Sequence, residues 1–175
     1  MKVDLKYKDE DDKCYGLTGV AISAVIWDVE YLLLSISLDS DAFNAIRYTP
    51  QVFIEGNTAI SPRNVLNNNI EKFRLTMGMT LANILCRTYV LENKFINHKT
   101  KQNIFDYFVK EGQNYCELDK DEVSSIFNKT YDYLHQIFSH PEVQKIANDF
   151  ATTLTNRRTL SQKEIIESLQ SLNLL

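Results

Sequence analysis

Residues 119–142, DKDEVSSIFNKTYDYLHQIFSHPE, decide the fold class, because they hold one complete helix pattern and the start of another. Asp119 and Glu122 match a capping box, in which each side chain bonds the backbone N–H of the other residue. Ser139 and Pro141 repeat the start signal, since proline costs little in a first helical turn. Between the two signals, apolar residues recur at helical spacing: Val123, Ile126, Phe127, Leu134, Ile137 and Phe138. The stretch predicts an amphipathic helix followed at once by a second one.

The same start signals precede two other apolar runs, at Ser61-Pro62 and at Ser161–Glu164. The run after Pro62 continues to about Glu92 and carries a heptad-like apolar seam: Leu66, Ile70, Phe73, Met77, Ile84 and Leu91. A shorter helical pattern covers residues 101–111. The chain of 175 residues contains only five glycines and three prolines, which suits long helices better than a β-fold with many turns.

We therefore predict an all-α fold, an irregular bundle of five to six helices built around two long helices, with one long crossing loop. The first long helix is expected from Leu17 to Ser37, and the crossing loop from Tyr48 to Ser61. Residues 1–13 contain five acids and four lysines and are expected to form a polar flexible tail. Residues 14–175 are expected to form a single helical domain.

Glu30 is the acid that we expect to find buried. On a continuous helix, the side of the surface that carries Glu30 is flanked by bulky apolar residues, whereas Asp28 lies on a roughly opposite side. A buried carboxylate needs a partner. Arg87 is the first candidate for this partner, because it occupies a position of the heptad-like seam at which the pattern predicts an apolar residue. Arg74 is the second candidate. The sequence predicts a structural Glu30–Arg87 pair between the two long helices, and the alternative is a polar pocket for a small anion or substrate.

The charge balance disfavours a nucleic-acid surface. The net charge is −4 and the pI is near 5.4, whereas binding to phosphates normally needs a basic face. Arg157 and Arg158, with Lys163, form the best local basic patch. Glu164 and Glu167 follow directly, so we expect this patch to be solvated surface.

Three widely spaced cysteines, Cys14, Cys86 and Cys116, contain no C-x-x-C pair and indicate reduced thiols and a cytoplasmic location. The apolar stretch from Leu17 to Leu38 is long enough to span a bilayer. Two central acids within it would be costly in lipid, so we expect no membrane association.

No catalytic, cofactor-binding or metal-binding motif is present in the sequence. Asp132 and His135 share a helix face at a spacing that di-metal bundles use, but such sites need the motif twice and it occurs once. We therefore assign no catalytic residues, no metal and no cofactor. The protein is expected to be non-enzymatic.

The nine phenylalanines and nine tyrosines are the remaining clue. An apolar group in and near the crossing loop must cover the bundle, line a groove or contact another chain. We favour covering the bundle, with a partner contact second, for this group of five residues: Phe43, Tyr48, Val52, Phe53 and Ile54.

Three functional hypotheses follow. The leading one is a cytosolic helical interaction or regulatory module, with a protein partner or with a second copy of itself. The alternative is a small-molecule-binding bundle, or an enzyme, with an internal pocket at Glu30 and Arg87. The third is a nucleic-acid-associated protein that uses Arg157 and Arg158.

Overall fold

The structure is a computed structural model that describes residues 6–42, 44–49 and 62–174, and for residues 62–68, 173 and 174 it describes the backbone alone. Within these ranges the chain is mostly helical with one small sheet, which confirms the predicted fold class. The α-helices are α1 (Glu10–Ile26), α2 (Pro62–Leu85), α3 (His98–Cys116), α4 (Lys120–Ser139), α5 (Pro141–Arg157) and α6 (Gln162–Leu169). A π-helical segment, η3 (Cys86–Leu91), continues α2, and short 3-10 segments are η1 (Glu30–Leu32) and η4 (Gln170–Leu174).

Three short strands form an antiparallel sheet in the order β2-β1-β3. The strands are β1 (Leu33–Ser37), β2 (Ile46–Tyr48) and β3 (Thr159–Ser161). In the register of the sheet, Ile36 faces Ile46 on one side and Leu160 on the other. The sheet thus ties the segment after α1 to the segment between α5 and α6.

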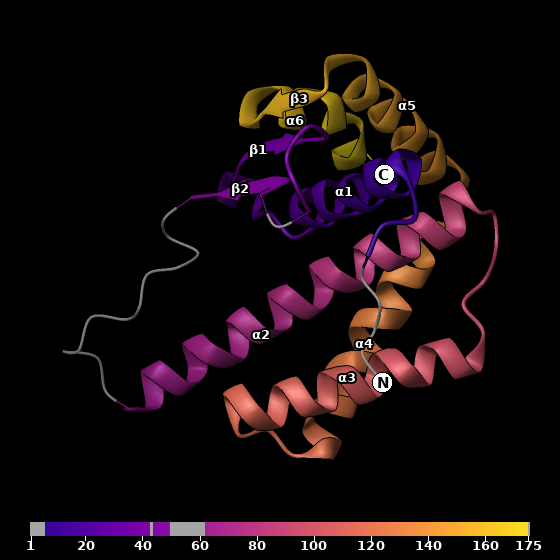
Figure 1. Ribbon diagram of the computed structural model, residues 1–175. Helices are drawn as coiled ribbons and strands as arrows, with labels where there is room; N and C mark the ends of the chain where they lie inside the picture. The colour runs from indigo at the N-terminus through magenta and orange to yellow at the C-terminus, as the bar shows by residue number, and fades with distance from the viewer. Residues whose placement is uncertain (1–5, 43, 50–61, 175) are drawn as a thin grey trace.

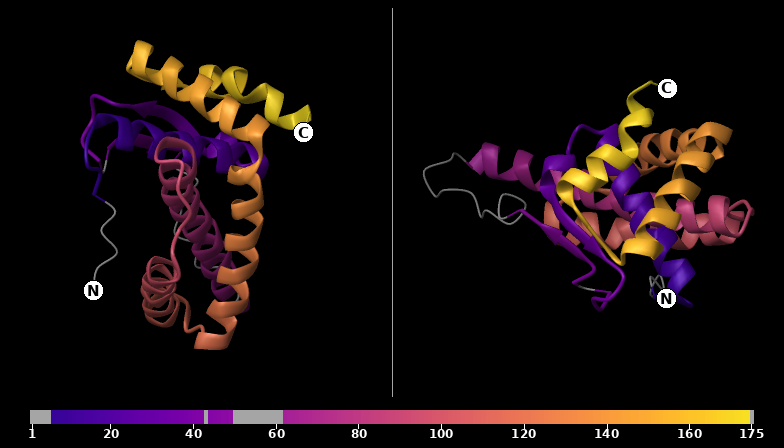
Figure 2. Two further views of the ribbon diagram at one scale, coloured as in Figure 1. Left: turned by 90° about the vertical axis from the view of Figure 1, so that its right-hand side faces the viewer. Right: turned by 90° about the horizontal axis from the view of Figure 1, so that it is seen from above.

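The helices form two groups, which the views in Figures 1 and 2 separate clearly. One group contains α1, α5, α6 and the sheet. The other contains α3, the length of α4 and most of α2, and α4 runs steeply away from α5 in the left view of Figure 2. The most extensive contact between two described elements is that of α1 with α2, and α1 also packs against η3, so this junction joins the two groups.

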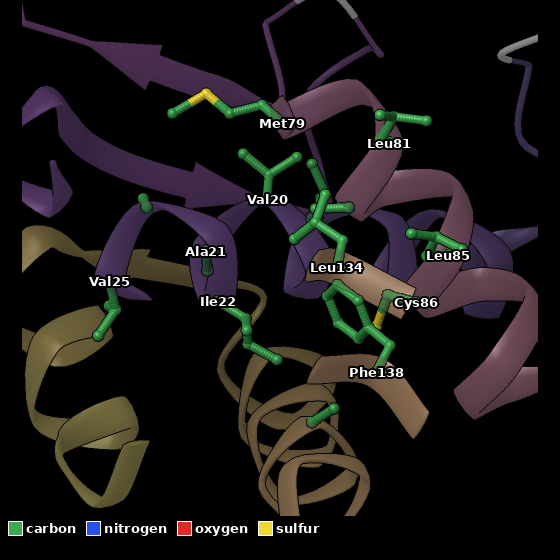
Figure 3. Packing of buried hydrophobic residues seen from close by; sticks show 14 of the residues in the cluster. Val20, Ala21, Ile22, Val25, Met79, Leu81, Leu85, Cys86, Leu134 and Phe138 are labelled. Carbon is green, nitrogen blue, oxygen red and sulfur yellow. The ribbon is translucent and has the colours of Figure 1, made fainter. Parts of the chain in front are cut away.

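The first helix, α1, lies at the centre of the core. Twelve of its seventeen residues are buried, which leaves it almost no solvent face. Its buried hydroxyls are satisfied within the helix, because Thr18 donates to the carbonyl of Cys14 and Ser23 to that of Val20, both at 2.8 Å. Figure 3 shows its apolar side chains among those of α2, η3 and α4; the labelled ones are Val20, Ala21, Ile22, Val25, Met79, Leu81, Leu85, Cys86, Leu134 and Phe138.

Glycines allow α1 and α2 to approach closely. A Cβ at Gly19 would lie 2.3 Å from the backbone oxygen of Ala82 and 2.8 Å from the Cβ of Cys86. On α2, a Cβ at Gly78 would lie 2.2 Å from the ring of Trp27. The two helices therefore meet with backbone against backbone at Gly19, and the indole ring covers the surface at Gly78.

The first helix is shorter than predicted, and the expected continuous helix to Ser37 is wrong. Asp28 has φ 54°, Val29 N–H donates to the carbonyl of Ala24 at 2.8 Å, and Asp28 N–H donates to that of Val25 at 3.1 Å. These bonds form a Schellman motif, which ends a helix by a left-handed residue. Residues 30–32 then form η1 and residues 33–37 form β1, where the prediction continued the helix.

The helices predicted to start at Pro62 and Pro141 do begin there, and the two predicted capping boxes are confirmed, whereas the predicted cap at Ser139 is wrong and Ser61 lies outside the described residues. Capping boxes are present at Asp119 with Glu122 and at Ser161 with Glu164. Ser139 instead belongs to the last turn of α4, and α5 begins after His140, whose side chain makes no capping bond, with Pro141 in the first turn as predicted.

The long second helix is confirmed over α2 and η3, whereas parts of the other boundary predictions lie outside the described residues. Helix α1 begins at Glu10, inside the segment that was expected to be a tail. The division of the chain into a tail and one domain stays a prediction, and most of the crossing loop lies outside the described ranges. None of the described helices is both long enough and apolar enough to cross a membrane.

We predict that Gly19→Ala lowers the free energy of unfolding by about 2 kcal/mol or more, because the added methyl group overpacks a contact with backbone that cannot move aside cheaply. An alanine in an unconstrained helix would instead be favoured over glycine by up to about 1 kcal/mol, so the sign of the change is informative. Urea unfolding measures it. The control is Ser125→Ala on the exposed side of α4, expected to change stability by less than about 0.5 kcal/mol. Unchanged or increased stability for Gly19→Ala would contradict the close approach.

Candidate functional site

Arg87, which the sequence singled out as a buried polar residue, pairs with Asp12 and not with Glu30. The Arg87 Nε–H donates to Asp12 Oδ1 at 2.6 Å, and Nη2 bonds Asp12 Oδ2, so the pair is bidentate. Only 3% of the Asp12 side chain and 11% of the Arg87 side chain are exposed. An ion pair thus joins the first turn of α1 to η3, but its acid is Asp12, so the predicted Glu30–Arg87 pair is wrong.

The same guanidinium holds the segment that precedes α1. Arg87 Nη2 donates to the carbonyl of Lys6 at 3.2 Å, and Arg87 Cζ lies 5.1 Å from the centre of the Tyr7 ring. The Tyr7 hydroxyl accepts from Asn83 Nδ2 at 2.9 Å. Gly16 makes room for this contact, because a Cβ there would lie 2.7 Å from the Tyr7 ring.

The ionisation of Asp12 is set by two opposing effects. Burial raises the pKa of the Asp12 carboxyl, but the hydrogen bonds from Arg87 and from the Lys8 backbone N–H, the latter at 2.8 Å, outweigh it. The pKa of Asp12 is therefore below its ordinary value of 3.8 in the folded protein. Burial likewise raises the pKa of the Tyr7 hydroxyl, with the Asn83 hydrogen bond acting in the opposite direction. The cluster thus contains a fixed ion pair and a neutral phenol at neutral pH.

The π-helical segment η3 carries Arg87 on one side and Tyr89 on the other. The Glu92 N–H donates to the carbonyl of Arg87 at 3.1 Å, the wide spacing that defines a π turn. Glu92 also forms an ion pair with Lys8 and a second, at 3.4 Å, with Lys94. Through η3 the start of the described chain is joined to the connection between α2 and α3.

The other residues of the predicted pair lie elsewhere. Glu30 begins η1 and is half-buried; its Oε2 atom is buried and has no hydrogen-bond partner in the described structure. Arg74 is exposed and pairs with Glu71 on the same helix at 3.1 Å. The structure therefore does not bring Glu30, Arg74 and Arg87 together, and a shared Glu30/Arg87 pocket does not form.

Of the five predicted interface residues, only Tyr48 is described. It lies in β2, is half-buried, and donates its hydroxyl to Met79 Sδ at 3.9 Å. Burial, with a smaller effect from Tyr7, raises the pKa of Tyr48 to about 12. The other four, Phe43, Val52, Phe53 and Ile54, lie outside the described residues.

The basic patch predicted at Arg157 and Arg158 is neutralised by acids. Arg158 donates to Glu10 at 2.6 and 2.9 Å and to Asp39 at 2.8 and 3.0 Å. Arg157 pairs with Glu164. These guanidiniums connect the end of α5 to α1, to the segment after β1 and to α6, so both charges are paired within the fold.

An aromatic cluster, which sequence analysis missed, surrounds His135. Its rings come from η3 (Tyr89), from the connection to α3 (Phe95) and from α4 (Tyr131, His135). The Phe95 ring is stacked on His135 at 6.3 Å between centres and meets the edge of Tyr89 at 5.4 Å. Tyr89 meets His135 at 5.4 Å, and the hydroxyls of Tyr89 and Tyr131 lie 3.4 Å apart. We call the exposed side of this cluster the Phe95 surface.

Exposure distinguishes Phe95 from the rest of its cluster. Among the described residues it is the large apolar side chain with the greatest exposure, 76%, whereas Tyr89 and Tyr131 are buried. Lys101, from the first turn of α3, places its ammonium 3.9 Å from the centre of the Tyr131 ring and 3.7 Å from Asp132. The predicted Asp132–His135 face is thus engaged by a lysine and by aromatic rings. Within the described parts of the chain no group of three metal-ligating side chains forms.

Comparisons of this chain with protein-family models, with curated proteins and with solved structures gave no match.

We predict that Asp12→Asn lowers the free energy of unfolding by about 3 kcal/mol, because it leaves the Arg87 charge buried without its counter-charge. Chemical denaturation at neutral pH measures the loss. The matched control is Glu71→Gln, which breaks the exposed pair with Arg74 and is expected to cost less than about 0.5 kcal/mol. Equal losses for the two variants would show that the Asp12–Arg87 pair has no special role.

We also predict a pH dependence for the Asp12 effect. The folded pKa of Asp12 is below its unfolded value, so the stabilisation is present above that unfolded value and is lost as the pH falls through the folded pKa. The stability difference between the native protein and Asp12→Asn should therefore shrink below about pH 4. A difference that stays constant from neutral to acidic pH would contradict the assigned ionisation.

Proposed function

We propose that this protein is a non-enzymatic interaction module of the cytosol, and that the Phe95 surface contacts its partner. The observation on which this proposal rests is that a phenylalanine is 76% exposed and yet lies against two rings, the edge of Tyr89 at 5.4 Å and the face of His135 at 6.3 Å between centres. An aromatic side chain has few rotatable bonds, so it loses little conformational freedom on binding, and it offers a large apolar contact, which is how aromatic residues become centres of protein interfaces.

Two further observations support this proposal. All three cysteines are free and buried, as expected for a protein of a reducing compartment. Burial raises the pKa of each of the three thiols, which disfavours their use as nucleophiles.

A second candidate function is small-molecule binding near Glu30. Its support is that Oε2 of Glu30 and Oγ1 of Thr49 are both buried without hydrogen-bond partners, and that Thr49 N–H donates to Leu32 of η1. We rank it second because Arg87, the cation expected to complete such a pocket, is bound to Asp12.

We predict that a photoreactive benzoyl-phenylalanine at position 95 forms discrete cross-linked products in an extract of the source cells. Tyr115, an aromatic residue with 70% exposure at the end of α3, is the matched control position and should give only a diffuse background. Mass spectrometry identifies the products, and an adduct of twice the chain mass would identify a second copy as the partner. Indistinguishable patterns at the two positions would contradict the proposal.

Phe95→Ser separates binding from folding. Because the side chain is mostly exposed, we expect unfolding free energy to change by less than about 1 kcal/mol. Unlabelled native protein should compete with the position-95 cross-link, whereas the serine variant should compete at least about tenfold less well. Equal competition by the two proteins would show that Phe95 does not contribute to the interface.

A further inference from the structure

Phe95 lies in a short segment of the chain that is rich in lysine. Residues 92–101 contain three lysines, Lys94, Lys99 and Lys101, and a single acid, Glu92, in a chain whose net charge is −4. Glu92 is shared, because it forms ion pairs with both Lys8 and Lys94. One carboxylate thus faces two ammonium groups, and the segment of sequence that carries Phe95 has more lysines than acids, although Asp132 of α4 pairs with one of them, Lys101.

The lysines of this segment have different roles. Lys101 is one-third exposed and is directed onto Tyr131 and Asp132, so it closes the side of the cluster next to α4. Lys94 has 70% of its side chain exposed, and Lys99 is also exposed. An aromatic ring with exposed ammonium groups on either side along the chain is suited to an apolar anchor flanked by carboxylates.

The chemistry favours an acidic peptide over a nucleic acid. The cations of this segment are lysines, which act as point charges, whereas Arg87, Arg157 and Arg158, which have the guanidinium fork that grips phosphates, are paired with acids within the fold. Binding to nucleic acid also normally requires a longer track of phosphate contacts than one short segment offers.

We propose that the Phe95 surface binds an acidic peptide segment that carries an aromatic or large apolar anchor, an inference that rests on the proposed function. The anchor packs against the open face of Phe95, and the flanking carboxylates pair with Lys94 and Lys99. Electrostatic attraction at this rim governs the choice of partner and the rate of encounter, and the aromatic contact limits the rate of dissociation.

Fluorescence anisotropy with three labelled peptides tests the proposal on the full chain. Each peptide has one central tryptophan, flanked by aspartate and glutamate, by asparagine and glutamine, or by lysine; a single-stranded oligouridine is the fourth probe. We expect the acidic peptide to bind at least about tenfold more tightly than the amide peptide, with an advantage that decreases as salt is added. Phe95→Ser should abolish this binding.

Charge-reversal variants of the two exposed lysines test the electrostatic part of the proposal, and the same reversal at a distant lysine is the matched control. Lys94→Glu and Lys99→Glu should each weaken binding of the acidic peptide by about threefold to tenfold, and the double variant should prefer the lysine peptide. Lys163→Glu makes the same change in net charge on α6, at a side chain that is 84% exposed, and should leave binding unchanged.

Equal affinity for the acidic and amide peptides, absence of binding by any peptide, or tighter Phe95-dependent binding of the oligouridine would each overturn the inference. The cross-link at position 95 separates this failure from failure of the proposed function. If a discrete adduct forms there and the two lysine reversals do not reduce it, the proposed function is retained and the proposal of an acidic partner is wrong. If no discrete adduct forms, the proposed function itself is wrong.

Discussion

The requirement that α1 be enclosed on every side determines the rest of the architecture. A helix with twelve buried residues out of seventeen needs partners around its whole circumference, and α2, η3, α5 and the sheet segment provide them. The tightest of these contacts is possible only because Gly19 has no side chain where Ala82 approaches. At the first turn of α1 the contact with η3 is polar: the Asp12–Arg87 pair joins the two elements by hydrogen bonds.

The sequence predicted the helices well where their starts carry local signals, and less well where tertiary context decides. Asp119 and Ser161 were recognisable as caps because the bonds they make are within four residues of chain. The end of α1 was not recognised, since its left-handed residue is Asp28, whereas glycine is the usual signal there. The alternation Leu34-Ser35-Ile36-Ser37 was an available indication of β1.

The candidate sites, too, were predicted where a local sequence pattern marks a residue and missed where tertiary contacts decide. Arg87 could be identified as buried because it interrupts an apolar seam, but its partner could not, since the Asp12 carboxylate lies in a segment that looked like a tail. Phe95 gave no signal at all. Ile96 is its one apolar neighbour between Asn93 and Asn97, and the surroundings of Phe95 depend on where η3 and α4 place Tyr89 and His135, which no local pattern encodes.

The hydrogen bond from Arg87 to the Lys6 carbonyl and the Lys8–Glu92 ion pair bring the first described residues next to the connection between η3 and α3, which contains Phe95. Residues 6–8 therefore occupy space beside this connection, and a bulky group attached at this end of the described chain, near Lys6, would shield it sterically. Affinity tags and reporter domains attached at that end would compete with ligands for the same space, so assays of native recognition call for a label joined elsewhere on the chain.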